Sequence, residues 1–452
     1  MANATRTERL DALPYTRSHH RLLMGSGVGW ALDAMDIGLI SFIMVAVAAA
    51  WHPSQGELSV LGSIGFVGMA IGASLGGLLA DRIGRRQVFA LTMLVYGVAT
   101  GLSALSTGLA MLIALRFVVG LGLGAELPVA STLVSEFAPR RIRGRMVVAL
   151  ESFWAIGWLL AAVIGYLLVP AHEDGWRWAL ALGAVPALWS LVIRFGLPES
   201  VRFLEARGRH EDAEAVVRDF ERAARIAPPS EPSPVAPPAP PATWRELWAT
   251  RYRTRTIALA LVWCGVNFSY YGAFIWLPTL LHQGGMEVVK SFEFVLWMTL
   301  AQLPGYLVAA VLVEVWGRRA TLIVFLAGSG IGALAFGTSP VLAEALWPGH
   351  QGAAAALALA TACVLSFFNL GAWGALYALT PEVFPTPLRA TGAGAATAAG
   401  RIAAMLAPLV VPVIAHAGGL GLLFAVFGAS FTLAAIAAAF LPEYANRALE
   451  EA

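Results

Sequence analysis

The chain of 452 residues is strongly apolar: 58% of its residues are hydrophobic, 13% are charged, and its mean hydropathy is +0.71. Soluble domains have about 25% charged residues, so this composition excludes a soluble protein and predicts a polytopic membrane protein. The formal net charge of +2 gives no indication of a nucleic-acid partner. The two cysteines, Cys264 and Cys363, lie far apart in apolar segments, so we expect no disulfide framework, metal site or cofactor.

Apolar stretches of about 20 residues, long enough to cross the hydrocarbon core, predict twelve membrane-spanning helices. They follow a polar amino-terminal segment, residues 1–21, that has no signal-peptide pattern. A first bundle within 22–198 is expected to contain the spans 22–50, 58–80, 87–106, 109–133, 146–169 and 177–197. A second bundle within 255–441 is expected to contain the spans 255–281, 291–313, 320–339, 352–379, 391–415 and 419–441. The predicted fold is an all-α membrane protein of two six-helix bundles.

The connection between the bundles, residues 199–254, has three parts. Residues 199–226 are charged and predict a helix at the membrane surface. Residues 227–241 contain eight prolines, which favours an extended tether, with a docking site for a partner as the alternative. Trp244 and Trp248 fit an interfacial anchor before the seventh span. A short tail, residues 442–452, ends the chain.

Arginines are concentrated in the connections on one side of these predicted spans. The opposite connections contain only Arg177 and Lys290 as basic residues. Because basic loops remain in the cytoplasm, we expect both termini to be cytoplasmic.

Three short motifs at the predicted cytoplasmic helix ends occur twice, roughly 240 residues apart. The first is DRIGRR at 81–86 and EVWGRR at 314–319, the second is E-x2-P-x3-R, and the third is LPE. A duplicated unit in an apolar chain indicates two pseudo-symmetric halves that rock around a central site, as in many secondary transporters. The motif residues predicted to form the cytoplasmic gate are Asp81, Gly84, Arg85, Arg86, Glu136, Arg143, Glu314, Gly317, Arg318, Glu382 and Arg389.

Charged residues inside the spans are costly and by default mark functional sites. Asp36 and Arg116 are expected at similar depths, which predicts an ion pair that carries a proton or, alternatively, a static pair that holds the first half together. Asp33 shares a helix face with Asp36. Glu126 and Glu151 fit a second proton station, part of an inner gate, or ion pairs with the arginines at 140–145.

Arg401 has no acid on its own predicted span, and none at a matching depth on the seventh, eighth or tenth span. We therefore expect an anionic substrate to neutralise it, because a guanidinium group matches a carboxylate. A structural arginine satisfied by backbone carbonyls or water is the alternative.

Aromatic and polar side chains share helix faces on three spans. Mixing of this kind favours cavity walls over lipid contact, and together with Arg401 it indicates a small aromatic ring that bears a carboxylate. The three sets are Asn267, Tyr270, Tyr271 and Phe274; Asn369, Trp373 and Tyr377; and Glu151, Trp154 and Trp158.

The paired motifs and twelve spans resemble the major facilitator superfamily, and within it the bacterial niacin permeases, which are related to synaptic vesicle glycoproteins and organic ion transporters. The matching stretches include GWALDAMD at 29–36, GAELPVAST at 124–132, LESFWAIGW at 150–158, FSYYG at 268–272, TLAQLPGY at 299–306 and SFFNLGAWG at 366–374. This resemblance implies the major facilitator fold and proton-coupled uptake of nicotinate across the inner membrane of a bacterium, by a monomer that is not an enzyme. The proline-rich segment is not a feature we associate with these permeases.

The resemblance also assigns roles to residues. Positions matching Trp154, Tyr270, Tyr271 and Trp373 line the ligand cavity in this branch, and the position of Arg401 carries arginine in members that move organic anions. In sugar-moving relatives, positions like Asp36 and Arg116 form the proton-coupling pair.

We therefore expect alternating access, with the pyridine ring held by aromatic side chains and its carboxylate by Arg401. An aromatic-acid:proton symporter for benzoate-like substrates and a non-transporting ligand sensor are the alternatives. The predicted ring contacts are Trp154, Trp158, Tyr270, Tyr271 and Trp373, and the candidates to bond the ring nitrogen are Asn267, Asn369, Gln302 and Tyr377.

Overall fold

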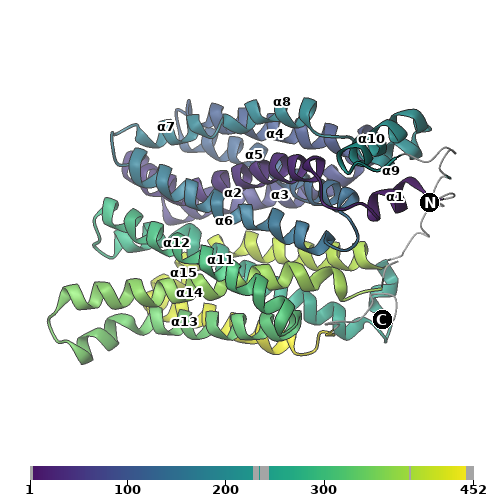
Figure 1. The fold of residues 1–452 in the computed structure, drawn as a ribbon. Helices are drawn as coiled ribbons and strands as arrows, with labels where there is room; N and C mark the ends of the chain where they lie inside the picture. Colours follow the sequence, from purple (N-terminus) through teal and green to yellow (C-terminus); the bar gives the residue numbers. More distant parts are fainter. Residues whose placement is uncertain (1–3, 228–233, 235–243, 386–387, 444–452) are drawn as a thin grey trace. The chain divides into compact units, whose positions relative to one another are not determined.

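The computed structural model describes residues 4–227, 234, 244–385 and 388–443, and these residues contain helices and turns but no strand (Figure 1). The predicted proline-rich tether, 227–241, lies outside the described residues except for Ala227 and Pro234. The carboxyl-terminal tail beyond Glu443 also lies outside them.

The helices agree closely with the predicted spans. Those before the central connection are α1 Arg6–Asp11, α2 Arg17–Trp51, α3 Gln55–Ile83, α4 Arg85–Ser103, α5 Leu109–Phe137, α6 Arg143–Leu168, α7 Gly175–Leu182 and α8 Val185–Gly196. The connection contains α9 Val201–Ala206, α10 His210–Ala223 and the 3-10 helix η1 Trp244–Trp248. The remaining helices are α11 Arg253–Gln283, α12 Val288–Val315, α13 Arg318–Leu346, α14 Gln351–Leu379, the 3-10 helix η2 Thr380–Glu382 and α15 Arg389–Ala438.

Ten helical stretches of the described residues are long and apolar enough to cross a membrane, and the stretch Gly175–Gly196 joins α7 and α8. Two differences explain why these ten stretches correspond to the twelve predicted spans. Helix α4 coincides with the third predicted span but is not among the ten. Helix α15 covers the last two predicted spans, which are separated by non-helical backbone at Gly418 and Gly419. The all-helical membrane fold is thus confirmed.

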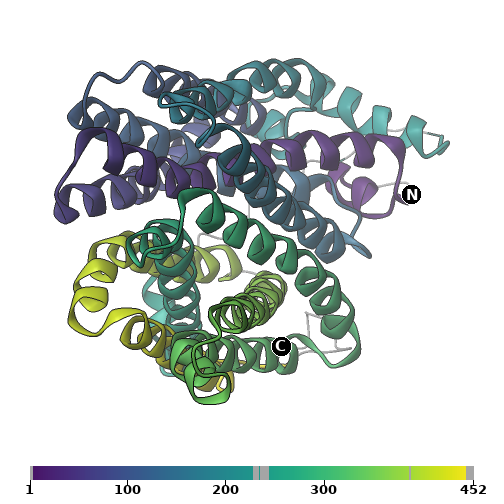
Figure 2. The same cartoon turned by 90° about the vertical axis from the view of Figure 1, so that its left-hand side faces the viewer.

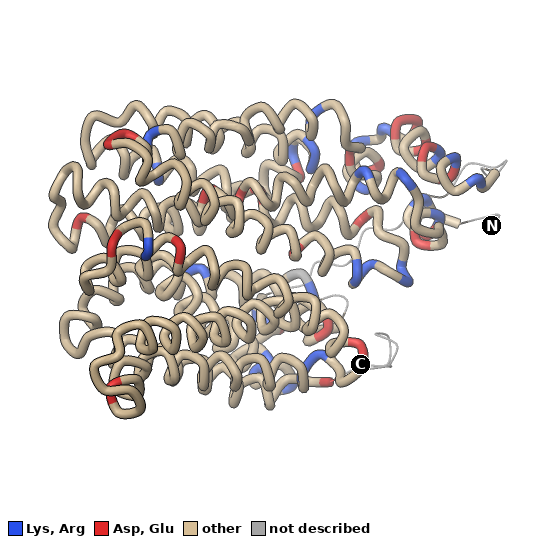
Figure 3. The backbone as a smooth tube through the Cα atoms, turned by 60° about the vertical axis from the view of Figure 1, so that its left-hand side comes forward, with Lys and Arg blue, Asp and Glu red and all other residues tan. Residues whose placement is uncertain are grey.

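Charged residues are sparse along the long helices and gather near helix ends and around α1, α9 and α10 (Figure 3). The predicted surface helix of residues 199–226 is two helices, because the chain turns at Gly208, where φ is +70°.

The structure divides into two compact units. The first comprises Met1–Asp36, Val67–Gly157 and Leu180–Ala239, and the second comprises Ile37–Phe66, Trp158–Ala179 and Pro240–Ala452. The boundary between the two units therefore falls within helices α2, α3 and α6, so each of these helices contributes residues to both units.

Helices of the first unit approach one another closely at small residues. Helices α4, α5 and α8 lie side by side (Figure 1). A Cβ atom placed on Gly72 of α3 would lie 2.1 Å from the carbonyl oxygen of Leu121, and one on Gly124 of α5 would lie 2.1 Å from that of Met69. Small residues allow such backbone contact between membrane helices, where packing rather than water drives association.

The helices of residues 253–438 pack as one bundle, which Figure 2 shows nearly end-on. Within this part of the second unit α11 packs on α15, α12 on α14, and α13 on both α14 and α15. The bundle thereby holds the aromatic faces of α11 and α14 inside the unit.

The duplicated motifs adopt the same geometry twice. In the first unit, Gly84 has φ +104°, and the following helix α4 starts with the backbone N–H of Arg86 donating to Glu199 Oε1 at 3.1 Å. The Arg86 guanidinium donates to the carbonyl oxygen of Leu197 at 3.2 Å. Glu199 therefore caps the amino terminus of α4, where a carboxylate is favoured by the helix dipole.

The second copy repeats each of these contacts. Gly317 has φ +93°, the N–H of Arg319 donates to Glu443 Oε2 at 2.9 Å, and its guanidinium donates to the carbonyl oxygen of Leu441 at 3.1 Å. A Cβ on Gly317 would lie 2.8 Å from the Glu443 carboxylate. In both units the LPE motif therefore folds back onto the GRR motif.

The remaining motif residues also meet within their own units. Arg85 lies 3.1 Å from Asp81 and 3.9 Å from Glu136, which also accepts a hydrogen bond from the Ser200 hydroxyl. Arg318 lies 3.3 Å from Glu382. Glu314 is exposed at the end of α12, Arg389 is half-buried at the start of α15, and Arg143 binds Asp11 and the carbonyl oxygen of Ala138.

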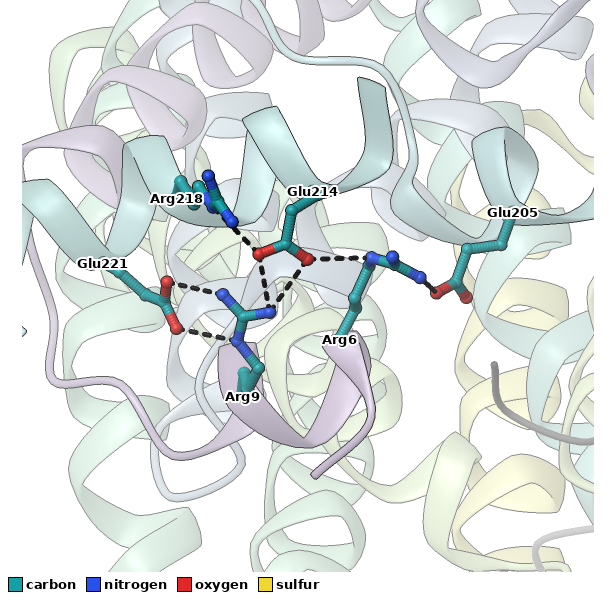
Figure 4. A network of polar contacts seen from close by, with 6 residues as sticks. All are labelled: Arg6, Arg9, Glu205, Glu214, Arg218 and Glu221. Atoms are coloured by element: carbon teal, nitrogen blue, oxygen red, sulfur yellow. Dashed lines mark hydrogen bonds and ion pairs between the residues drawn. The ribbon is translucent and has the colours of Figure 1, made fainter. Parts of the chain in front are cut away.

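The amino-terminal segment contains helix α1, which the sequence analysis treated as part of a polar tail. Its arginines are buried against the acidic side chains of α9 and α10 (Figure 4). Arg6 binds Glu205 at 2.8 Å and Glu214 at 3.1 Å. Arg9 donates to Glu221 at 2.8 and 2.6 Å and to both oxygens of Glu214 at 2.9 Å.

These contacts set the ionisation of the network. Burial alone raises the pKa of the Glu214 carboxyl group, but its bonds to Arg9, Arg218 and Arg6 outweigh burial and lower it below the usual value. A carboxyl group with a lowered pKa stabilises the fold above its unfolded pKa, and this contribution disappears as the pH falls through the folded pKa.

We predict that Arg9→Ala releases α1, because it leaves Glu214 and Glu221 without this buried partner. Breaking a buried ion pair from one side costs about 3–5 kcal/mol. Proteolysis of residues 4–13 should accelerate strongly in this variant, and the protection of their amides from hydrogen exchange, relative to the intrinsic rate at the same pH, should fall. In the wild type this protection should fall as the pH becomes acidic. Arg222→Ala is the matched control, since Arg222 is exposed on α10 and pairs with the exposed Asp219; equal acceleration in both variants would contradict the prediction.

Candidate functional site

An aromatic cluster forms the centre of the candidate substrate site in the second unit. Tyr270 of α11 contacts Trp158 of α6 edge-to-face at 5.5 Å, Trp373 of α14 at 5.8 Å and Tyr271 at 5.2 Å between ring centroids. All four rings are buried. Edge-to-face pairs at this separation contribute about 0.5–1.5 kcal/mol each beyond area burial. The structure thus brings together four of the five predicted ring contacts, and their contact with substrate stays a prediction.

The cluster continues toward the carboxyl-terminal end of α14. Tyr377 stacks on Trp373 at 5.7 Å with an interplanar angle of 25°. Trp263 contacts Trp373 at 5.8 Å and Tyr377 at 5.2 Å, and its indole N–H donates to the Thr380 hydroxyl at 3.1 Å. Trp263 was not predicted, although its place four residues before Asn267 puts it on the same helix face.

Asn267 lies between the aromatic residue Trp263 and helix α15. Its Nδ2 donates to the carbonyl oxygen of Trp263 at 2.8 Å. Gly400 of α15 packs against it, since a Cβ there would lie 2.7 Å from Asn267 Nδ2 and 3.2 Å from the Trp263 carbonyl oxygen. The half-buried Arg401 is the next residue along α15.

Several buried polar atoms of the second unit have no hydrogen-bond partner among the described residues. Buried polar groups are nearly always paired, so each of these atoms is a candidate to bind a ligand or water. Arg401 contributes a cationic donor, Gln302 contributes both a donor and an acceptor, and the indoles contribute donors. These atoms are Arg401 Nη1, Gln302 Nε2 and Oε1, Asn369 Oδ1, Trp373 Nε1 and Trp158 Nε1.

Trp154 belongs to the first unit and is half-buried on α6. Its predicted contact with substrate stays a prediction.

The first unit contains the predicted ion pair. Arg116 of α5 donates to Asp36 of α2 through Nη1 at 3.0 Å and Nη2 at 3.3 Å. Thr100 of α4 completes a triad, because its hydroxyl donates to Asp36 Oδ1 at 2.6 Å and accepts from Arg116 Nη2 at 2.9 Å. The pairing is therefore confirmed, Thr100 was not predicted, and a role in proton coupling stays a prediction.

Three further ionisable residues lie together in the same unit. Asp33 of α2, Glu126 of α5 and Tyr96 of α4 are fully buried, and the Asp33 side chain interacts with both others. The structure thus places Glu126 beside Asp33. Glu151 is buried on α6.

Comparison with known proteins identifies the family. The profile of the family described as "Sugar (and other) transporter" matches residues 24–452. The chain belongs to this family. It is a multi-pass membrane transporter and not an enzyme.

Two similar relatives are bacterial. The transporter is 45% identical to the niacin transporter NiaP of Acinetobacter baylyi, with 91% of each chain covered. It is 44% identical to the putative niacin/nicotinamide transporter NiaP of Bacillus subtilis, covering 88% of this chain and 89% of the relative. The synaptic vesicle 2-related protein of Bos taurus is 29% identical, covering 98% of this chain and 82% of the relative.

The fold is that of the major facilitator superfamily. The transporter superposes on a partially occluded inward-open structure of the xylose transporter XylE from E. coli with a TM-score of 0.76, covering 95% of this chain and 99% of the other. The identity is 21%, so this likeness establishes the fold alone.

We predict that Gly400→Ala loosens the site. The new methyl group would meet the Asn267 amide and the backbone of Trp263, and overpacking of this kind costs about 1–3 kcal/mol. Thermal unfolding in detergent should show a lower Tm than wild type. Gly394→Ala on the same helix is the matched control, since nothing lies within 4 Å of its Cβ position and alanine favours the helix; an equal loss in both variants would refute the packing argument.

Proposed function

We propose that this transporter carries nicotinate into a bacterial cell together with a proton, by alternating access across the inner membrane. The observation that carries the proposal is the buried aromatic cluster around Tyr270, which lies in one unit with unpaired polar atoms and Arg401. Similar relatives at 44–45% identity are named as niacin transporters. A small aromatic acid matches both the aromatic side chains, which would pack against its ring, and Arg401, which would bind its carboxylate.

The ring of nicotinate would pack against the aromatic cluster, and its carboxylate would bind Arg401. The pyridine nitrogen accepts a hydrogen bond and therefore needs a donor. Asn267 already uses Nδ2 to bind the Trp263 carbonyl oxygen, whereas Gln302 Nε2 and Trp373 Nε1 have no partner among the described residues. Of the four residues predicted to bond the ring nitrogen, Gln302 is therefore the best supported.

Proton coupling is assigned to the ionisable residues of the first unit. The Asp36–Arg116 pair is buried and held by Thr100, so a change in helix packing that separates it would change the affinity of Asp36 for a proton. Cotransport of one anion and one proton moves no net charge. The duplicated motifs, with both termini in the cytoplasm, would keep the inner helix ends together as the halves rock.

The direct test is uptake of labelled nicotinate by purified protein in liposomes with an imposed pH gradient. Uptake should follow the pH gradient, respond weakly to membrane voltage, and be blocked by unlabelled nicotinate but not by nicotinamide. Stronger competition by benzoate would move the substrate to the aromatic-acid class. Saturable binding without flux would instead support a ligand sensor, and strong voltage dependence at fixed pH would exclude the one-to-one stoichiometry.

Arg401→Ala should weaken nicotinate binding by about 10- to 150-fold, since a hydrogen bond to a charged group is worth about 1.5–3 kcal/mol. Arg401→Lys should give an intermediate loss, because lysine keeps the charge but lacks the planar fork. Equilibrium binding in detergent, with Arg222→Ala as the exposed control, provides the measurement. Unchanged affinity in Arg401→Ala would remove this residue from the site.

A further inference from the structure

Two carboxyl groups face one another inside the first unit. Asp33 and Glu126 come from different helices, α2 and α5, and both have an exposed fraction of 0%. Their side chains are within hydrogen-bonding reach of one another. Glu126 also lies close to Gly29, one helical turn before Asp33, because a Cβ placed on Gly29 would lie 3.4 Å from Glu126 Oε1, an ordinary contact distance. The carboxyl group of Glu126 therefore lies directly against the backbone of α2.

A hydrogen bond between two carboxyl groups requires a proton. Ionised carboxylates are acceptors only, and a protonated carboxyl group has one O–H donor. Neither oxygen of Glu126 has a hydrogen-bond partner of any other kind among the described residues. The contact is therefore attractive when the pair holds one proton and repulsive when both groups are ionised.

The nearby positive charge is already committed to another acid. Arg116 uses both Nη atoms on Asp36 and Thr100. It lies ten residues before Glu126 on α5, a rise of about 15 Å along the helix. Ionisation of both Asp33 and Glu126 would place two negative charges side by side, which a membrane interior strongly disfavours.

A tyrosine from a neighbouring helix also interacts with the pair, and α6 contributes the buried acid Glu151 to the same unit. Tyr96 of α4 interacts with Asp33 and also faces Asp36 and Glu126. On the other sides, α3 presents Met69 to Gly124, and α6 presents Phe153 to Gly27.

We propose that Asp33 and Glu126 form a shared-proton site that binds the coupling proton, while Asp36 remains the ionised partner of Arg116. This inference rests on the proton coupling of the proposed function and moves the proton from Asp36 to the Asp33–Glu126 pair. Separation of α2 from α5 would release the proton, because it removes the acceptor that holds it. Tyr96 would position Asp33 through its hydroxyl group.

The first test is chemical and does not depend on the substrate. An apolar carbodiimide reacts with protonated carboxyl groups in apolar surroundings, and peptide mass spectrometry identifies the modified residue. Asp33 or Glu126 should be labelled in the intact transporter in liposomes, and labelling should decrease as the pH rises. Glu293→Gln, at an exposed acid of α12, should not change it. Absence of label from both residues at every pH would overturn the proposal.

The second test separates binding of the proton from transport of the substrate. Glu126→Gln and Asp33→Asn should retain exchange of nicotinate across the membrane but lose gradient-driven accumulation, which a gradient of one pH unit would otherwise raise about tenfold. Asp36→Asn should keep the carbodiimide label on the pair. Tyr96→Phe should shift the pH dependence of labelling while preserving packing. Normal accumulation by both Glu126→Gln and Asp33→Asn would refute the assignment, whereas labelling without any nicotinate flux in the wild type would refute the proposed substrate and leave the proton site standing.

Discussion

Every polar side chain inside a membrane bundle has to find its partner within the protein, because the hydrocarbon offers none. The ion pair of Arg116 with Asp36, bridged by Thr100, is the clearest case. Three helices supply its three members, so the pair fixes how α2, α4 and α5 pack. The neighbouring acids Asp33 and Glu126 can hydrogen-bond to each other only when the pair holds a proton.

The two copies of the duplicated unit share a scaffold but differ in their buried chemistry. The glycine at positive φ and the glutamate that caps the next helix occur in both, at Gly84 with Glu199 and at Gly317 with Glu443. Inside the spans the correspondence ends. Asn267 stands roughly where the repeat would place Asp33, and this amide binds a backbone carbonyl and holds no proton. Acids are thus concentrated in the first copy, and aromatic side chains with Arg401 in the second.

Features with a regular sequence signal were predicted well. Apolar length defined the spans, helix depth brought Asp36 to Arg116, and shared helix faces grouped Tyr270 with Trp373. Thr100 was missed because a lone hydroxyl group in an apolar helix has no periodic signal. Trp263 had such a signal, because it lies one turn before Asn267 on the same helix face, but the predicted face began only at Asn267.

Contacts that depend on tertiary packing had no comparable signal. Helix α1 is a single short helix, and the burial of its arginines depends on ion pairs with acids about 200 residues away, such as Glu214 and Glu221. Depth along the chain also placed Glu126 near the cytoplasmic end of its span without indicating which helix it faces. This contact with Asp33 joins two helices, α2 and α5, that lie far apart in the sequence, so no spacing along the chain indicates it. The glycine at position 29, one turn before Asp33, shows how local the packing is, because a Cβ there would lie 3.0 Å from Phe89 Cζ of α4 and at an ordinary contact distance of 3.4 Å from Glu126 Oε1.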